Sequence, residues 1–226
     1  MRLLFLGRKD HEQTQEALDY CKLRFDTDYA LGEWGDSLPD IVNTWQGDYM
    51  FNFLGRWILP QSVLSLPSRA AINFHPAPPE YPGFGPINWA LYDNVDFYGV
   101  TCHHMTKKID TGEIIKPLYF KIYQNDTVES VLKKTYCYEL YLFYDIVDMI
   151  INRKYLPYSP VKWSGVNRKR SDLDKLAVVD ITMSGTEIER RRRAVTYKQW
   201  GIINGNTIRD AKPSKSVKGT DGSGNG

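Results

Sequence analysis

The chain has few cysteines, and they are not arranged in pairs. Cys21, Cys102 and Cys137 are the three cysteines among 226 residues, and no two of them form a Cys-x-x-Cys motif. An odd number of widely spaced cysteines makes neither a disulfide framework nor the paired thiolates of a structural zinc site. This usage is typical of a reducing compartment, and we expect a cytoplasmic protein.

Long hydrophobic runs are also missing. No apolar run reaches the roughly 18–20 residues that span a bilayer. The apolar stretch Met1–Gly7 is followed at once by Arg8, Lys9 and Asp10, and it is shorter than the apolar region of a signal peptide. We therefore expect no membrane segment and no leader, and we interpret residues 3–6 as a first buried strand.

A strong charge of either sign is absent as well. The formal net charge is +2, so bulk electrostatics give no reason to expect nucleic acid or a membrane surface as a partner. A local basic run at residues 190–193 comes shortly after Glu187 and Glu189. For this run we favour a solvated helix face over an anion-binding role.

What the chain does have is a core-forming pattern, with 42% hydrophobic residues. Strand and helix patterns alternate in its first half and continue beyond it. We expect strands at residues 3–6, 25–30, 48–54, 70–74, 99–105 and 114–122, with a weaker candidate at 41–42. We expect helices at residues 11–24, 60–66, 86–94 and 127–153, with Asp10 capping the first and Asp126 or Thr127 the last. This alternation predicts an α/β fold with a largely parallel sheet.

The remainder of the chain has weaker patterns. Residues 155–169 are rich in proline, lysine and aromatics and indicate irregular structure, and Ser184 begins a capping box for a short helix through Arg193. Residues 212–226 are a low-complexity Lys/Ser/Gly segment that we expect to be disordered. We divide the chain into a core over residues 1–153, a C-terminal extension over 154–211 and the tail.

Three polar residues stand where the pattern predicts a ligand site. Asn73 and His75 are two residues apart at the end of a predicted strand, so their side chains share one face of the sheet. Pro76 then ends the strand, because it has no N–H for the ladder. Asp110 lies in a second turn beside Thr111-Gly112. The carboxyl ends of strands bind ligands in open α/β sheets, and amide, imidazole and carboxylate together suit acyl transfer.

The surrounding motifs resemble the 10-formyltetrahydrofolate-dependent formyltransferases over about residues 48–153. The motifs are Ile58-Leu59-Pro60, Ile72-Asn73-Phe74-His75-Pro76, Tyr81-x-Gly83, Pro86-Ile87-x-Trp89-Ala90, Gly99-Val100-Thr101-x-His103 and Asp110-Thr111-Gly112-Glu113-Ile114. The resemblance implies a Rossmann-like catalytic core. Compared with the larger members, the N-terminal half is short, and one strand–helix unit is missing or reduced.

Within this family the chain is most similar to the sugar N-formyltransferases. The loop from His75 to Tyr81 reads His-Pro-Ala-Pro-Pro-Glu-Tyr, and the segment Arg193-Ala194-Val195-Thr196-Tyr197 is similar to a C-terminal region of that branch. The chain has no room for the C-terminal β-barrel of the methionyl-tRNA enzymes, which argues against tRNA as the acceptor. The resemblance also suggests a homodimer.

The chemistry implied is attack of a sugar amine on the formyl carbon of N10-formyltetrahydrofolate. Asn73 would donate to the oxyanion and Asp110 would orient His75. His75 either accepts the amine proton or, when protonated, stabilises the oxyanion, and both roles stay open. A lone Asn or His at a strand end is more often structural, and Asp110 could be only a turn residue. The three together favour catalysis.

Binding residues follow from the same resemblance. For the folate we expect a pocket between residues 54–59 and 107–112, lined by Arg56, Trp57, Ile58, Leu59 and Asp110. For the nucleotide sugar we expect Arg8 and Lys9 at the diphosphate, Tyr81 and Trp89 at the sugar, and Tyr197 or Trp200 at the base. Trp57, Ile58 and Trp89 have the alternative interpretation of ordinary core residues.

A metal site at Cys102, His103 and His104 is the remaining possibility. Neighbours on a strand point to opposite faces and cannot easily share one ion, so we expect no metal. His103 we interpret as a packing or hydrogen-bonding residue.

The sequence therefore predicts a sugar N-formyltransferase, most similar to those acting on a dTDP-4-amino-4,6-dideoxyglucose in surface-glycan (O-antigen) synthesis. The alternatives are formylation of another amine, such as glycinamide ribonucleotide, and a non-catalytic folate- or nucleotide-binding module.

Overall fold

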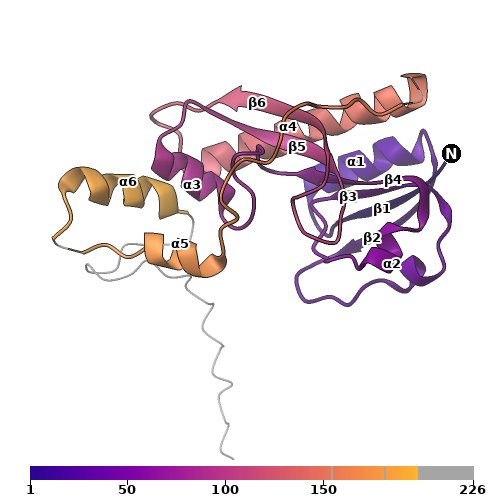
Figure 1. Ribbon diagram of the computed structural model, residues 1–226, viewed down its shortest axis with the longest axis horizontal. Helices are drawn as coiled ribbons and strands as arrows, with labels where there is room; N and C mark the ends of the chain where they lie inside the picture. The colour runs from indigo at the N-terminus through magenta and orange to yellow at the C-terminus, as the bar shows by residue number, and fades with distance from the viewer. Residues whose placement is uncertain (154, 181, 198–226) are drawn as a thin grey trace, which may run out of the picture.

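A single sheet organises the computed structural model, which describes residues 1–153, 155–180 and 182–197. The six strands lie in the order β2-β1-β3-β4-β5-β6 (Figure 1). They are β1 (Arg2–Arg8), β2 (Asp26–Gly32), β3 (Gly47–Phe53), β4 (Pro67–His75), β5 (Phe97–His104) and β6 (Ile114–Lys121). All six follow the strands expected from the sequence, within a few residues at each end.

The direction of the strands changes at β4. Strands β1 to β4 pair in parallel, whereas β5 is antiparallel to β4 and β6 is antiparallel to β5. The expected α/β fold with a largely parallel sheet is confirmed. The link from β2 to β3 has only the four-residue 3-10 helix η1 (Asp40–Asn43), which is the reduced unit of the N-terminal half.

Helices cover the two faces of the sheet unequally. The long helices α1 (Glu12–Lys22) and α4 (Val128–Asp148) lie on one face (Figure 1), and α4 continues as a π-helical turn, η2 (Met149–Arg153). The short helix α2 (Gln61–Leu64) and η1 cover the other face. Their packing residues Val42 and Val63 join Leu4, Leu6 and Met50 of the sheet. Since side chains alternate along a strand, the phenylalanines of β1, β3 and β4 face α1 and α4.

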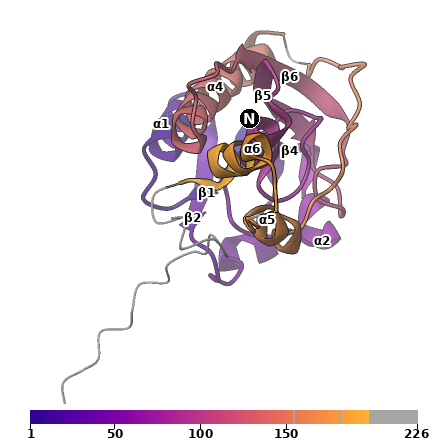
Figure 2. The same ribbon diagram turned by 90° about the vertical axis from the view of Figure 1, so that its left-hand side faces the viewer.

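A smaller layer lies at one end of the molecule. It consists of α3 (Pro86–Asp93), α5 (Arg170–Leu176) and α6 (Gly185–Val195), which share an apolar cluster (Figures 1 and 2). Asn88 of α3 donates to the carbonyl of Ala194 in α6 at 2.6 Å. The C-terminal extension is therefore packed against the core rather than separate from it.

The arginines of α6 hold this layer together. Arg190, Arg191 and Arg193 donate to main-chain carbonyls of neighbouring elements, and the acceptors are Tyr92, Lys175, Leu176, Val178, Asp126 and Tyr123. Arg192 instead pairs with Glu189 at 3.2 Å on the surface. The interpretation of this run as a solvated helix face is wrong for Arg191 and Arg193, which are partly buried, whereas Arg190 and Arg192 are exposed. The guanidinium groups satisfy carbonyls at element ends.

Two local expectations are also wrong. Residues 41–42 form part of η1 rather than a strand, and Asp10 does not cap α1, since His11 occupies the N-cap position without a side-chain hydrogen bond. Thr127 does cap α4, in a capping box with Ser130. Ser184 likewise accepts from the backbone N–H of Glu187 at the start of α6.

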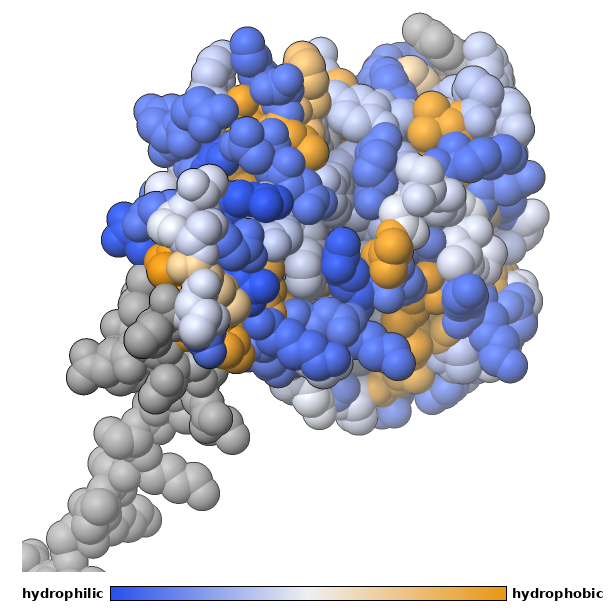
Figure 3. Space-filling model, turned by 60° about the vertical axis from the view of Figure 1, so that its left-hand side comes forward, coloured by the Kyte–Doolittle hydropathy of each residue, from blue (hydrophilic) through white to orange (hydrophobic). Residues whose placement is uncertain are grey.

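The molecular surface shows apolar residues in small groups among polar ones on the face drawn in Figure 3. None of the helices in the described part of the chain is long and apolar enough to cross a membrane. The predicted disordered tail, residues 212–226, lies outside the described residues.

Candidate active site

Three polar side chains form a row across neighbouring strands. Asn52 of β3 is the register partner of Asn73 of β4, and Asn73 is the register partner of His103 of β5. Register partners point to the same side of a sheet. The sheet itself therefore aligns two amides and an imidazole on the face opposite α1 and α4.

Hydrogen bonds connect this row. Asn52 Nδ2 donates to Asn73 Oδ1 at 2.6 Å, and Asn73 Nδ2 lies 3.0 Å from His103 Nε2. His103 Nδ1 lies 2.8 Å from the carbonyl oxygen of His104, which can only accept. His103 thus carries its proton on Nδ1, and Nε2 accepts from Asn73. Burial and the neighbouring His75 hold the pKa of His103 well below its usual range, so the ring is neutral.

His75 and Asp110 stand next to the row. The His75 Nδ1 atom lies 3.4 Å from Asp110 Oδ1, and the same oxygen lies 3.7 Å from His103 Nε2. Burial lowers the pKa of His75, while Asp110 and the backbone carbonyl of Tyr81 oppose the decrease. His75 Nε2 is buried, with no hydrogen-bond partner in the described part of the chain. A neutral imidazole with one ring nitrogen oriented by a carboxylate and the other free has the arrangement of a general base.

A loop places Asp110 at this point. Asp110 has a positive φ of 51°, and the backbone N–H of Gly83 donates to its Oδ2 at 3.4 Å. Gly112, two residues later, lies against the carbonyl of His104 with no room for a Cβ atom. The Asp-Thr-Gly turn therefore needs its glycine to fold the loop back over the sheet.

Trp163 forms a wall of the site. Its Nε1–H donates to the carbonyl of Gly112 at 2.8 Å, and its ring lies edge-on to His103 and His75, with centroid distances of 5.0 and 5.7 Å. Trp163 belongs to the irregular segment after residue 153, so the extension helps to enclose the core's polar residues. Asn52, Asn73, His75, His103 and Asp110 are called the β4 site below.

A cavity of about 490 Å³ opens from the β4 site. All five residues expected to contact folate line it: Arg56, Trp57, Ile58, Leu59 and Asp110. Trp57 is partly buried, packs against the cluster of η1 and α2, and donates to the carbonyl of Ser37 at 2.9 Å. Ile58 is 69% exposed and is therefore not a core residue. Arg56 lies over the ring of Trp34 at 5.1 Å, and its buried Nε has no partner among the described residues. The lining is mostly apolar with a few polar groups, as small-molecule sites are.

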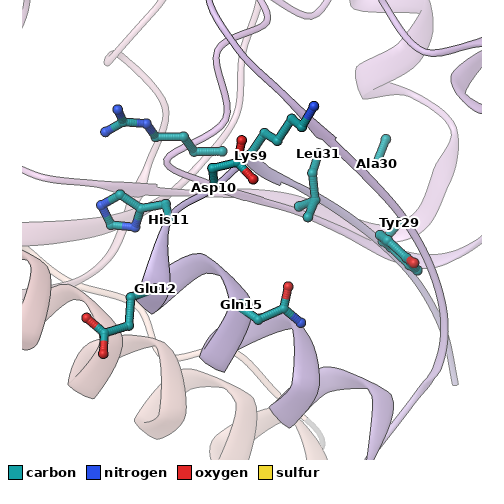
Figure 4. A pocket seen from close by; sticks show the side chains of 9 residues that line it. Lys9, Asp10, His11, Glu12, Gln15, Tyr29, Ala30 and Leu31 are labelled. Atoms are coloured by element: carbon teal, nitrogen blue, oxygen red, sulfur yellow. The ribbon is translucent and has the colours of Figure 1, made fainter.

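A second, more open pocket of about 710 Å³ lies beyond the carboxyl end of β1 (Figure 4). Arg8, Lys9, His11 and Gln15 line it together with the acidic residues Asp10 and Glu12, and we call it the β1 pocket. Arg8 Nε is 3.3 Å from Glu33 Oε1. Burial, Arg8 and Arg56 lower the pKa of His11, whose ring lies edge-on to that of Tyr136 at 4.7 Å. The structure thus brings the predicted diphosphate residues Arg8 and Lys9 to one concave surface.

The remaining expected sugar and base contacts do not line either cavity. Tyr81 donates to Asp93 at 3.1 Å, and Trp89 is 7% exposed within the cluster of α3 and α6, with its Nε1–H on the carbonyl of Phe84. Tyr197 packs against the same cluster. Trp200 lies outside the described residues. For Trp89 the geometry favours the alternative interpretation, a helix core residue.

Two residues of the site escaped the sequence analysis, because no motif marked Asn52 or Trp163. Outside the site, Glu139 in the inward-facing stripe of α4 was missed as well. Glu139 is fully buried, neither carboxylate oxygen has a partner in the described part of the chain, and burial raises its pKa well above the usual range. A charged residue at an apolar position of the helix period was the available signal.

No metal centre is formed by the described residues, since they contain no group of three or more His, Cys, Asp or Glu that could hold an ion. Cys102 packs in the cluster under α1 and α4, whereas His103 faces Asn73 on the other side of the sheet. The two neighbours do point to opposite faces.

Comparison with known proteins adds to this geometry. Residues 39–147 match the formyl transferase family. The bifunctional polymyxin resistance protein ArnA of Wigglesworthia glossinidia brevipalpis is 33% identical over 163 residues, which are 71% of this chain and 24% of that protein. The chain thus spans about a quarter of the length of this curated relative.

Solved structures share the fold at low identity. An N-formyltransferase from Helicobacter canadensis, in complex with folinic acid and dTDP-3-aminofucose, superposes with a TM-score of 0.70 at 21% identity, over 92% of this chain and 86% of that one. A 4-N formyltransferase from Francisella tularensis gives 0.71 at 18% identity, over 91% and 95%. The family resemblance drawn from the sequence is confirmed over residues 39–147, which match the formyl transferase family.

Proposed function

We propose that this protein is a sugar N-formyltransferase that moves a formyl group from N10-formyltetrahydrofolate to the amine of a nucleotide-linked amino sugar. The observation that carries the proposal is the joint placement of Asn73, His75 and Asp110 beside an apolar cavity at the carboxyl end of β4. The fold shared with N-formyltransferases supports it.

The geometry of the β4 site fits a folate formyl donor, which supplies the one-carbon group when bound. Asn73 uses one of its two amide hydrogens on His103, so the other remains to donate to the formyl oxygen as that oxygen gains negative charge. His75 Nε2 is buried and unpartnered within the described chain, so it can accept the proton that the attacking amine loses. The lowered pKa of His75 favours the base role over a protonated donor.

Asp110 completes this arrangement as the orienting group. Its Oδ1 lies near Nδ1 of His75, which leaves Nε2 as the lone-pair nitrogen. As the amine proton arrives on Nε2, the carboxylate stabilises the resulting imidazolium. The new C–N bond forms and the bond from the formyl carbon to N10 breaks. His75 Nε2 passes the amine proton to N10, so tetrahydrofolate leaves protonated at N10 and the neutral imidazole is regenerated.

The acceptor would lie toward the β1 pocket. Arg8 and Lys9 there supply positive charge for a diphosphate. Arg56, which lines the folate cavity, interacts electrostatically with Arg8, so the two cavities are near one another at this point. We infer a dTDP-4-amino-4,6-dideoxyglucose type of acceptor serving surface-glycan (O-antigen) synthesis. A cytoplasmic location and a homodimer are part of the same proposal.

The test is a competition assay read by mass spectrometry. The protein is offered N10-formyltetrahydrofolate with dTDP-, UDP- and GDP-linked amino sugars and glycinamide ribonucleotide together, and the Asn73→Ala variant is the control. We expect one acceptor to gain the mass of a formyl group with the wild type and not with the variant. Formylation of glycinamide ribonucleotide instead would move the acceptor outside nucleotide sugars, and folate binding without any transfer would leave a binding module.

A further inference from the structure

We propose that Asn52 is a positioning residue, which acts on the formyl donor's oxygen only through the amide of Asn73. The proposal rests on the proposed function, since it assigns Asn73 as the donor to that oxygen. Asn52 lines the cavity of about 490 Å³, and its Nδ2 lies 2.6 Å from Asn73 Oδ1. Nothing in the sequence motifs marks it.

The donor and acceptor of each hydrogen bond in the row can be assigned starting from His103. The carbonyl of His104 can only accept, so His103 Nδ1 must hold a proton and donate to it. A neutral imidazole has one protonated nitrogen, so His103 Nε2 must accept. The group of Asn73 that faces this nitrogen is therefore the NH₂.

The other end of the amide is then determined as well. With the NH₂ of Asn73 toward His103, its Oδ1 points to β3, where it needs a donor. Asn52 supplies that donor through Nδ2. The Asn73 amide is thus held on both sides, by an acceptor on β5 and a donor on β3, and it cannot turn over without placing two acceptors together.

The spare hydrogen of Asn73 is what this arrangement orients. One N–H of the NH₂ bonds His103, and the second points away from the row toward the cavity. An N–H that polarises a carbonyl must be preorganised to be effective. Hydrogen bonds in a chain also polarise one another, so donation into Asn73 Oδ1 strengthens its N–H as a donor. Asn52 therefore affects the chemical step more than ligand binding.

Asn52 is itself held by packing. Its Oδ1 is buried and has no hydrogen-bond partner in the described part of the chain, and Gly55 lies against that oxygen with no room for a Cβ atom. The Gly55→Ala substitution would therefore displace the Asn52 side chain without changing its chemistry. It gives a second way to disturb the same contact.

The experiment measures kcat and KM for Asn52→Ala, Asn52→Asp and Gly55→Ala, with the exposed Asn43→Ala as a matched control. We expect Asn52→Ala to lower kcat about 10-fold, the scale of one hydrogen bond, with KM and the Kd for the folate unchanged. Asn52→Asp replaces the donor with an acceptor facing Asn73 Oδ1, so we expect a greater loss, about 100-fold. A residue that only fills space would show the opposite order, because Asp is the closer isostere.

A double-substitution cycle tests the route of the effect. In the Asn73→Ala background, Asn52→Ala should change the residual kcat less than 2-fold, because the group it positions is gone. An equal loss in both backgrounds, or a loss confined to KM, would overturn the proposal. Melting temperatures identify any variant that fails to fold, and Gly55→Ala then decides the same question.

Nuclear magnetic resonance tests the positioning role of Asn52 independently of whether the protein has formyltransferase activity. If the wild type formylates no amine, the function fails, but the row can still be examined in the free protein. We expect Asn52→Ala to shift the side-chain NH₂ resonances of Asn73 and the ring nitrogens of His103, and Asn43→Ala to leave them in place. Unmoved resonances in Asn52→Ala would refute the positioning role whatever the enzyme's activity.

Discussion

The β4 site and the β1 pocket lie at the same edge of the sheet but are built in opposite ways. In the β4 site the side chains are buried or partly buried, and they are linked to partners on neighbouring elements. In the β1 pocket Arg8 is partly exposed and Lys9 is exposed, and both lie at the end of one strand. Transfer of a formyl group needs donors and acceptors held in fixed positions, whereas holding an anion needs accessible charge. The difference suggests that one region performs the chemistry and the other retains the substrate.

The largest expected loss of activity comes from Asn73→Ala in the β4 site. Removing a preorganised oxyanion donor lowers kcat by roughly 10²–10³-fold in well-studied sites, and we expect the same here with the Kd for the folate unchanged. Steady-state kinetics and a folate titration check it, with Asn43→Ala as the control. A parallel loss of folate affinity would mean that Asn73 contributes to folate binding rather than to stabilising the transition state.

Substitutions in the β1 pocket should change KM for the nucleotide sugar rather than kcat. We expect Arg8→Ala to raise the KM for the nucleotide sugar by roughly 10-fold or more, because charge-assisted hydrogen bonds contribute about 1.5–3 kcal/mol. The kcat should stay within a few-fold. Lys133→Ala on the exposed side of α4 removes the same charge elsewhere. If kcat falls while KM stays constant, the division between the two regions is wrong.

A third prediction concerns the buried carboxyl group of Glu139. It interacts electrostatically with Arg56, which in turn interacts with Arg8 of the β1 pocket and lines the folate cavity. Burial raises its folded pKa, so the protonated form stabilises the fold below the unfolded pKa near 4.5, and this stability is lost as pH rises toward the folded pKa. We expect Glu139→Gln to raise the free energy of unfolding by roughly 1–3 kcal/mol at pH 7.

Urea unfolding at pH 4 and pH 7 measures this effect. The advantage of Glu139→Gln should disappear at the lower pH, where both side chains are neutral. Glu129→Gln on the same helix, at the surface, should change little at either pH. An advantage of equal size at both pH values would show that charge is not the cause.

The smallest expected effect is a shift in pH dependence. Burial lowers the pKa of His75 and Asp110 partly opposes it, so Asp110→Asn removes the opposing charge and should lower the pKa further. If neutral His75 is the base, the acid limb of kcat/KM moves to lower pH in this variant, by about one unit. An alkaline limb that moves to lower pH in this variant would instead indicate that protonated His75 is the active form.

The chemistry of the β4 site was more predictable from sequence than its construction. Asn73, His75 and Asp110 are marked by a strand that ends at a proline and by a glycine turn, which are local signals. Asn52 became part of the site only through the pairing of β3 with β4, and strand register is set by the whole sheet. No pattern within residues 47–53 carries that information.

The C-terminal extension was the least predictable part. Trp163 reaches the two histidines from a segment without periodicity, and α5 has no apolar repeat long enough to detect. The arginines of α6 read as solvent-facing because four adjacent charges usually are. Here the neighbouring helix ends present free carbonyls, and a carbonyl at a helix end needs a donor.

The polar row across β3, β4 and β5 also has a consequence for folding. The residues around it in β4 are Ala70, Ala71, Ile72 and Phe74, all apolar, so burial alone distinguishes poorly between β4 in its native alignment and β4 displaced by one residue. A displacement by one would turn Asn73 and His75 into the phenylalanine cluster under α4, where nothing could bond them. The same amides that serve a ligand in the finished protein thus select the correct strand alignment while the sheet assembles.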